Sequence, residues 1–153
     1  MLLRKVADVN AQDYYGTRES LQPTELAFGT LQVRDAPSFM HQEAVASFFV
    51  ALREHARSRA LGHVCIAPLD VVLDEPRALI VQPDVFFVSN ERDGIVGSRI
   101  YGPPDLVVDE QRLEIVTFVD SAIDRRKFVA IDETIDSPCL PAFTFTLRQV
   151  LDR

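Results

Sequence analysis

Lysine is nearly absent from this sequence: only Lys5 and Lys127 occur in 153 residues. Any mechanism that needs a lysine must use one of these two. The net charge of −7 excludes a broad, non-specific surface for nucleic acid, which requires an excess of lysine and arginine. A local basic groove is still compatible with that charge. Four arginines could line such a groove: Arg92, Arg99, Arg125 and Arg126.

Several other features are absent, and each absence narrows the function. The two cysteines, Cys65 and Cys139, belong to no recognisable motif, which is typical of a reducing compartment. No apolar stretch is long enough to span a bilayer, so we expect a cytoplasmic protein with no membrane partner. There is no glycine-rich phosphate loop, no nucleophile motif and no histidine pair at metal-ligand spacing.

The chain is 47% hydrophobic, enough for a substantial core, and we expect one domain over residues 1–153. Residues 1–22 are poorly patterned. The clearest element is a long helix over residues 38–60, whose apolar stripe follows a three- and four-residue spacing. Ser38 is a candidate N-cap for this helix, and Leu61–Gly62 is a natural stop.

Most of the remaining chain predicts strands. Residues 25–33 indicate a strand or a hairpin turning at Gly29-Thr30, and residues 64–73 and 79–88 indicate an antiparallel pair. A short strand covers residues 105–109, and residues 113–119 and 128–131 indicate a further hairpin. The pattern predicts an α+β fold with a mixed β-sheet and one long helix packed on it.

The most unusual strand is residues 79–88, which is apolar on both sides of the step Gln82-Pro83-Asp84. Proline gives up a ladder hydrogen bond, and a buried carboxylate is costly unless it is paired or bound to a metal. Side chains alternate across a strand, so we expect Asp70, Gln82 and Asp84 to share one side of the antiparallel pair. We also expect Pro68 to lie opposite Asp84.

Acidic residues gather on or beside the predicted core strands. Mg²⁺ prefers oxygen ligands and can activate water for attack on a phosphodiester, so converging carboxylates favour that ion as the cofactor. Aspartates at strand edges and turns also commonly just reach solvent. The acidic residues concerned are Glu25, Asp70, Asp84, Asp105 and Asp109.

Several short segments, in this order, resemble the Uma-two family of putative restriction endonucleases. The segments read APS…HQ over residues 36–42, GHV…APLDVVL over 62–73, VQPDVFFV over 81–88 and GPPDLVV over 102–108, with a tail SPCLPAF over 137–143. The resemblance implies a restriction-endonuclease-like fold of the PD-(D/E)XK type. It also implies DNA as the partner and Mg²⁺-dependent phosphodiester hydrolysis as the reaction.

The resemblance also implies catalytic residues. Glu25 falls on the glutamate of the family's ELIDG segment, which here reads ELAFG. Asp84 falls on the aspartate of QPD, the first metal-binding acid. Asp109 falls on the second metal-binding acid, a glutamate in the family's PDLVVEVLSPS.

After Asp109 the family pattern stops. The family continues with a helix that bears the active-site lysine and then a strand, on the order of 30 residues by their usual lengths. This chain proceeds directly to the predicted hairpin, so we expect a fold truncated relative to the family. Gln111 carries no charge, and Lys127 lies in the later hairpin, so neither is a good substitute for the lysine.

Two functions remain open. The first is a degenerate nuclease with weak or no cleavage activity, which keeps Asp84 and at most one Mg²⁺. The alternative is a non-catalytic interaction module, expected to be a homodimer, in which a second copy covers sheet surface that the deletion exposes. Gene decay would leave the same pattern. Convergence of Glu25, Asp84 and Asp109 in the structure is the decisive observation.

Overall fold

The computed structural model describes residues 8–17, 23–109, 114–119, 122–128, 130, 132–146 and 148. Its elements, in chain order, are α1 (Ala11–Tyr15), β1 (Thr24–Ala27), β2 (Thr30–Val33), α2 (Phe39–Ser58), β3 (Gly62–Ile66), β4 (Val71–Asp74), β5 (Leu79–Val81), β6 (Val85–Ser89), the 3-10 helix η1 (Asn90–Ile95), β7 (Ile100–Tyr101), β8 (Leu106–Asp109), β9 (Glu114–Val119), β10 (Ala122–Phe128), β11 (Thr134–Ile135) and β12 (Phe145–Thr146).

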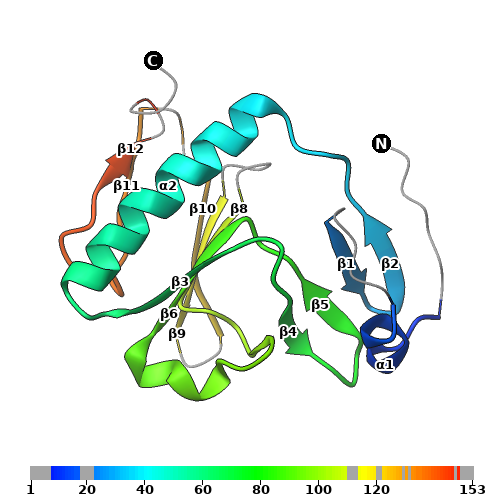
Figure 1. The fold of residues 1–153 in the computed structure, drawn as a ribbon. Helices are drawn as coiled ribbons and strands as arrows, with labels where there is room; N and C mark the ends of the chain where they lie inside the picture. Colours follow the sequence, from blue (N-terminus) through cyan, green and yellow to red (C-terminus); the bar gives the residue numbers. More distant parts are fainter. Residues whose placement is uncertain are drawn as a thin grey trace.

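These strands form two main sheets that lie side by side, with α2 across one face of the second (Figure 1). Sheet A has the order β2-β1-β5-β4-β7, and its β4–β7 pair is parallel. Sheet B has the order β10-β9-β8-β6-β3 and is antiparallel throughout. A separate two-stranded ladder joins β11 to β12. The predicted α+β class is confirmed.

The predicted helix is present as α2 and is shorter than expected at its C-terminal end. Ser38 is its N-cap and accepts a hydrogen bond from the backbone N–H of His41 at 3.2 Å. The left-handed residue after the helix is Ala60, with φ 51°, and the N–H of Leu61 donates to the carbonyl of Ala56. The helix therefore ends at Ser58, two residues before the predicted end at Ala60.

Gly62 has a different role, at the start of β3. Its φ is +154°, and a Cβ built on it would lie 2.1 Å from the carbonyl oxygen of Val88. A side chain at this position would therefore prevent β3 from pairing with β6.

The main core lies between α2 and sheet B. The stripe predicted for the helix supplies Ala44, Val45, Phe48, Leu52 and Ala56, each at most 7% exposed. It packs on the face of sheet B that presents Val85, Phe87, Leu106 and Val108. The opposite face of sheet B, with Phe86 and Val88, packs against Val71 and Ile100 of sheet A.

The predicted pair of long strands is divided between the two sheets. The chain leaves β3 of sheet B after Ile66 and enters β4 of sheet A at Val71. It returns from β5 to β6 across residues 82–84. The Gln-Pro-Asp step is therefore a crossing point, which explains why Pro83 is tolerated within an apolar run.

Three further predictions are resolved. The residues 25–33 segment is a hairpin, with Phe28 and Gly29 both at positive φ in a two-residue turn. The later hairpin is β9 and β10, with the second strand at 122–128 rather than near 128–131. Among the described residues, no helix combines the length and apolar character needed to cross a membrane.

Candidate functional site

Asp84 and Asp109 lie on neighbouring strands at the same end of sheet B. β6 and β8 pair with Val85 opposite Val108, so continuing the register by one residue places Asp84 opposite Asp109. Because side chains alternate along β8, Asp109 lies on the face of sheet B away from α2, whereas Asp84, directly before β6, lies 3.5 Å from His41 in the first turn of α2. The register thus places the two acids that the resemblance implies as metal ligands next to each other at one end of sheet B.

Glu25 reaches the same place from sheet A. It lies in β1, and its side chain is 10% exposed. Its Oε1 accepts the backbone N–H of Gln82 at 3.0 Å, and its Oε2 accepts a guanidinium N–H of Arg34 at 2.8 Å. Both carboxylate oxygens are therefore engaged by the chain itself.

Arg34 joins the three acids. It follows β2 directly, and its guanidinium lies 2.8 Å from Glu25 and 3.6 Å from Asp109. Burial lowers the pKa of Arg34, but the carboxylates of Glu25, Asp109 and Asp84 outweigh burial and hold that pKa above its ordinary value. The side chain is 25% exposed, so the cation is largely enclosed by the acids.

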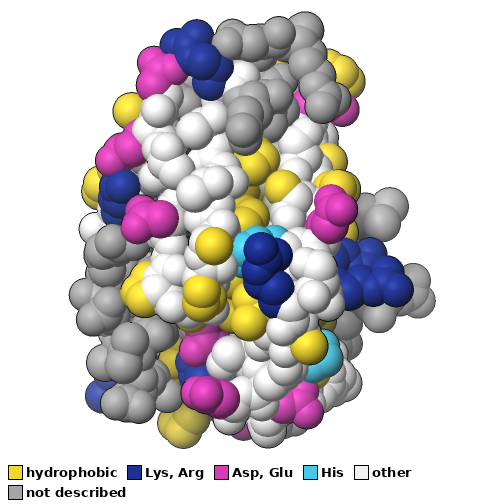
Figure 2. Space-filling model, turned by 90° about the vertical axis from the view of Figure 1, so that its left-hand side faces the viewer, with side chains coloured by type: hydrophobic (Ala, Val, Ile, Leu, Met, Phe, Trp, Pro, Cys, Tyr) yellow, Lys and Arg dark blue, Asp and Glu magenta, His cyan; other side chains and the backbone are white. Residues whose placement is uncertain are grey.

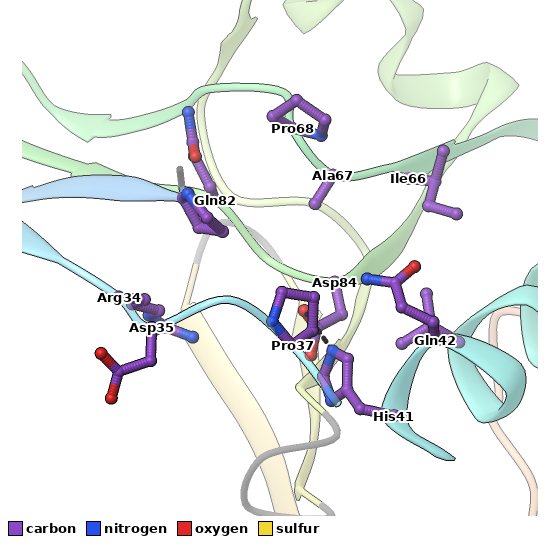
Figure 3. A pocket seen from close by; sticks show the side chains of 12 residues that line it. Arg34, Asp35, Pro37, His41, Gln42, Ile66, Ala67, Pro68, Gln82 and Asp84 are labelled. Atoms are coloured by element: carbon purple, nitrogen blue, oxygen red, sulfur yellow. Dashed lines mark ion pairs between the residues drawn. The ribbon is translucent and has the colours of Figure 1, made fainter. Parts of the chain in front are cut away.

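Asp84 also faces a histidine. The Nε2 of His41, in the first turn of α2, lies 3.5 Å from Asp84 Oδ1, and each side chain is 14% exposed. Figure 3 shows the two side chains pointing toward each other in a cleft of about 150 Å³. Gln42 lies on the helix side of this cleft, and Pro68 lies on the opposite wall.

The arrangement does not fit the metal ion that the resemblance implies. Mg²⁺ requires oxygens at about 2.0–2.1 Å in a near-octahedral set. Arg34 lies between Glu25 and Asp109, and both oxygens of Glu25 already accept hydrogen bonds. Within the described part of the chain, no group of three histidine, cysteine or acidic side chains is placed to hold a metal.

Gln111 and Lys127 are the two residues considered in place of the family's lysine, and the structure describes Lys127. Lys127 lies in β10 opposite Ile115, which in turn lies opposite Val108. Directly opposite residues share a face, so Lys127 lies on the α2 side of sheet B, away from Asp109. Its ammonium pairs with Glu133 at 2.8 Å. Gln111 lies outside the described residues.

Asp70 is not part of this cluster, although it was expected beside Asp84. Its carboxylate accepts hydrogen bonds from Tyr14 at 2.8 Å, Gln82 at 2.9 Å and Arg99 at 3.0 Å. The predicted contact of Asp70 with Gln82 is confirmed. The expected partner of Asp84 is wrong by one residue, because the N–H of Ala67, and not Pro68, lies opposite and donates to the carbonyl of Asp84.

The remaining acid, Asp105, is also used within the fold. It is 8% exposed, accepts the backbone N–H of Ser89 at 2.8 Å and pairs with Arg92 at 3.5 Å. Arg99 is likewise paired, with Asp70. Two of the four arginines expected to line a basic groove therefore neutralise internal aspartates and lie at separate positions.

Sequence reasoning missed Arg34, although the hairpin contains a signal for it. Glu25 is paired with Gln32 in the β1–β2 ladder, so Arg34 is the diagonal neighbour of Glu25 on the same face. The backbone N–H of Arg34 donates to the carbonyl of Pro23, which extends the hairpin by one more pair. The register of the hairpin therefore predicts the ion pair between Glu25 and Arg34.

Comparison with known proteins identifies the fold and the family. A crystal structure of a putative nuclease belonging to DUF820 from Anabaena variabilis superimposes with a TM-score of 0.71 at 8% sequence identity, over 94% of this chain and 98% of that chain. At that identity the likeness shows the fold. A search of the curated proteins finds no match. The model of the Uma2 family, described as putative restriction endonuclease, matches residues 11–109, which is well over half of the chain and ends at Asp109. The chain therefore belongs to the Uma2 family of putative restriction endonucleases.

Proposed function

We propose that this protein is a degenerate nuclease: it keeps the nuclease fold and its acidic site but has little or no cleavage activity. One observation supports this proposal most strongly. The guanidinium of Arg34 lies between Glu25 and Asp109, and its pKa is raised by these two acids and by Asp84. The acids that would hold a metal are engaged by a cation of the chain itself.

By the family resemblance, phosphodiester hydrolysis needs a divalent metal and a lysine, and this site supplies both poorly. A divalent metal lowers the pKa of the attacking water and neutralises charge on the phosphate. Arg34 carries a positive charge, but a guanidinium neither ligates nor ionises a water molecule. Lys127, one of the two lysines in the sequence, lies on the other face of sheet B, so it does not replace the family's catalytic lysine.

DNA remains the partner to test, and we expect its binding to be weak. Arg92 and Arg99 are paired with Asp105 and Asp70, which lowers the charge available for phosphates. On the face drawn in Figure 2, basic, acidic and hydrophobic side chains are interspersed. The slope of log affinity against log salt measures phosphate contacts, and we expect it to be close to zero.

A cleavage assay tests the proposal directly. Purified protein is incubated with supercoiled and linear DNA in the presence of Mg²⁺ or Mn²⁺, beside Asp84→Ala as the matched control. We expect both proteins to leave the DNA intact. Metal-dependent cleavage by the unaltered protein that disappears in Asp84→Ala would restore a working enzyme.

The alternative function, a homo-oligomeric interaction module, is favoured by exposed apolar side chains on α2. Phe39 is 76% exposed and Val50 is 61% exposed. They lie eleven residues apart, and so on the same side of the helix, opposite its buried stripe. An interface with a second copy of the chain would cover these side chains.

Sedimentation equilibrium distinguishes the two functions. A dimer that dissociates in Phe39→Asp but persists in Phe28→Asp would support the module. Phe28 is the matched control because it is 67% exposed but lies on the β1–β2 turn. A monomer over the whole accessible concentration range would remove the alternative.

A further inference from the structure

Arg34 is fixed in the site by its backbone as well as by its side chain. It follows β2, where its N–H donates to the carbonyl of Pro23 at 2.9 Å. The next few residues lead into α2, which begins at Phe39. The backbone of Arg34 is therefore held between the last ladder pair of the hairpin and the segment that leads into the long helix.

We infer that Arg34 is a tethered cation that takes the place of the divalent metal ion which the family resemblance implies, and that the site of this protein is consequently metal-independent. This inference rests on the proposed function. It names Arg34 as the residue concerned, excludes a bound divalent metal, and gives Arg34 the structural role that such a metal would have.

The charges at the site require a cation. Glu25, Asp84 and Asp109 contribute three negative charges, and Arg34 contributes one positive charge, with a second from His41 whenever that imidazole is protonated. Like charges brought together disfavour the ionised forms unless an opposite charge lies among them. In a nuclease with the same acids, a divalent metal would meet this requirement.

Arginine meets the requirement permanently. A guanidinium keeps its proton at every pH at which proteins are folded. Here the surrounding carboxylates hold its pKa above the ordinary value in spite of burial. No physiological change of pH therefore releases the position, in contrast to a lysine, whose charge is more easily lost on burial.

Arg34 also joins sheet A to sheet B, which is the structural role that a bound metal would have. Glu25 lies on β1 of sheet A, and Asp109 ends β8 of sheet B. The guanidinium lies 2.8 Å from the first and 3.6 Å from the second, and so joins the two sheets where the chain crosses between them. The Glu25 oxygen nearest Arg34 lies 2.8 Å from the guanidinium, so a metal ion bound there would lie beside a like charge.

The test compares Mn²⁺ binding and thermal unfolding in three proteins: the unaltered chain, Arg34→Gln and Arg92→Gln. Arg92 is the matched control because it is 20% exposed and pairs with the buried Asp105, as Arg34 is 25% exposed and pairs with the buried Glu25. Calorimetric titration with MnCl₂ gives the affinity. Melting temperatures are recorded in EDTA and in MnCl₂.

We expect the unaltered protein to melt at the same temperature in EDTA and in MnCl₂. Arg34→Gln should melt several degrees lower in EDTA and recover in MnCl₂, with an affinity for Mn²⁺ at least roughly tenfold above that of the other two proteins. Adding Asp109→Asn should abolish this gain. Arg92→Gln should lose stability without recovery.

Two results would overturn the inference. One is Mn²⁺ binding by the unaltered protein that Asp109→Asn abolishes, and the other is an Arg34→Gln protein that responds to Mn²⁺ no more than Arg92→Gln does. If Arg34→Gln does not fold in EDTA, folding on addition of Mn²⁺ supports the inference, and failure to fold in either condition contradicts it.

Arg34→Lys gives a second, independent arm. It keeps the positive charge, and we expect it to fold and to remain insensitive to Mn²⁺; a Mn²⁺ response equal to that of Arg34→Gln would contradict the inference. Failure here is separable from failure of the proposed function. Cleavage of DNA by the unaltered protein tests the function, whereas the metal response of the Arg34 variants tests the tethered cation.

Discussion

The carboxylate of Asp70 and the carboxylates around Arg34 lie near the two ends of the same Gln-Pro-Asp step, but they are satisfied differently. Asp70 receives three donors, from Tyr14, Gln82 and Arg99, at 2.8 to 3.0 Å. At the other cluster, a single guanidinium lies among three acids. At Asp70, one acid accepts hydrogen bonds from several donors. Around Arg34, several acids share one cation.

This difference distinguishes an acid that serves the fold from the cluster that we propose to be a degenerate site. A buried acid that serves the fold is stabilised when each oxygen meets dedicated donors, as at Asp70. Converging acids are typical of sites that hold a multivalent cation. Arg34 makes the second cluster compatible with a stable fold. The comparison predicts large effects at Asp70 and progressively smaller ones among the acids around Arg34.

The largest effect is expected for Asp70→Ala. It would remove the acceptor of Tyr14, Gln82 and Arg99 together, and partly buried donors without an acceptor are costly. We expect a loss of about 2–4 kcal/mol in the free energy of unfolding, measured by urea denaturation. The control is Asp74→Asn, at an aspartate that is 33% exposed and pairs with Arg77. A loss for Asp70→Ala below that of the control would contradict the assignment of Asp70 as a structural hub.

Glu25→Gln should have the next largest effect. The carboxylate pairs with Arg34 and accepts the N–H of Gln82, and the amide can keep only part of this. Hydrogen bonds to charged groups contribute about 1.5–3 kcal/mol each, and Arg34 is a quarter exposed, so we expect a loss of about 1–2 kcal/mol. Urea denaturation at two salt concentrations would measure it, and a gain in stability would contradict the pairing.

Tyr14 sharpens the comparison through pH. Burial, followed by the hydrogen bond to Asp70, raises the pKa of Tyr14 well above its ordinary value of 10.0. The folded phenol therefore keeps its proton where the unfolded chain has lost it, so its stabilising contribution is complete below pH 10 and declines above it. We expect the free energy of unfolding to fall above pH 10.

The control for this prediction is Tyr14→Phe, measured over the same pH range. Its free energy of unfolding should be about 1 kcal/mol lower at neutral pH and should decline less steeply above pH 10. Part of the decline should remain, because burial also raises the pKa of Tyr15. Identical slopes in the two proteins would show that Tyr14 does not titrate as proposed.

Asp109→Asn should have the smallest effect. Its carboxylate lies 3.6 Å from the guanidinium, with 22% of the side chain exposed, and the substitution also relieves repulsion from the neighbouring acids. We expect a change within about 0.5 kcal/mol by urea denaturation. A loss as large as that of Glu25→Gln would show that Arg34 depends on Asp109 as much as on Glu25.

Sequence reasoning was most successful where the signal is local. The stripe of α2, its Ser38 cap and the hairpin of residues 25–33 depend on spacing and turn chemistry within a few residues. The turn itself lies at Phe28-Gly29, one residue before the predicted Gly29-Thr30. The acids Glu25, Asp84 and Asp109 were selected through the family resemblance, and the structure brings all three to Arg34. Their catalytic role and the Mg²⁺ cofactor stay predictions.

The division of the long strands between two sheets was not predictable from the same signals. Residues 79–88 read as one strand because apolar periodicity does not report which sheet a segment joins. Arg34 was missed for a similar reason, since an arginine after a strand reads as a solvated residue until the hairpin register is fixed. The segment that follows Asp109, residues 110–113, lies outside the described residues.

We propose above all that Arg34, and not a metal ion, occupies the space between Glu25 and Asp109. Crystals soaked in MnCl₂ test this most directly, because manganese is located by its anomalous scattering. We predict no manganese at this cluster and a guanidinium within hydrogen-bonding distance of Glu25. A manganese ion ligated by Asp84 and Asp109, with Arg34 displaced, would contradict the account.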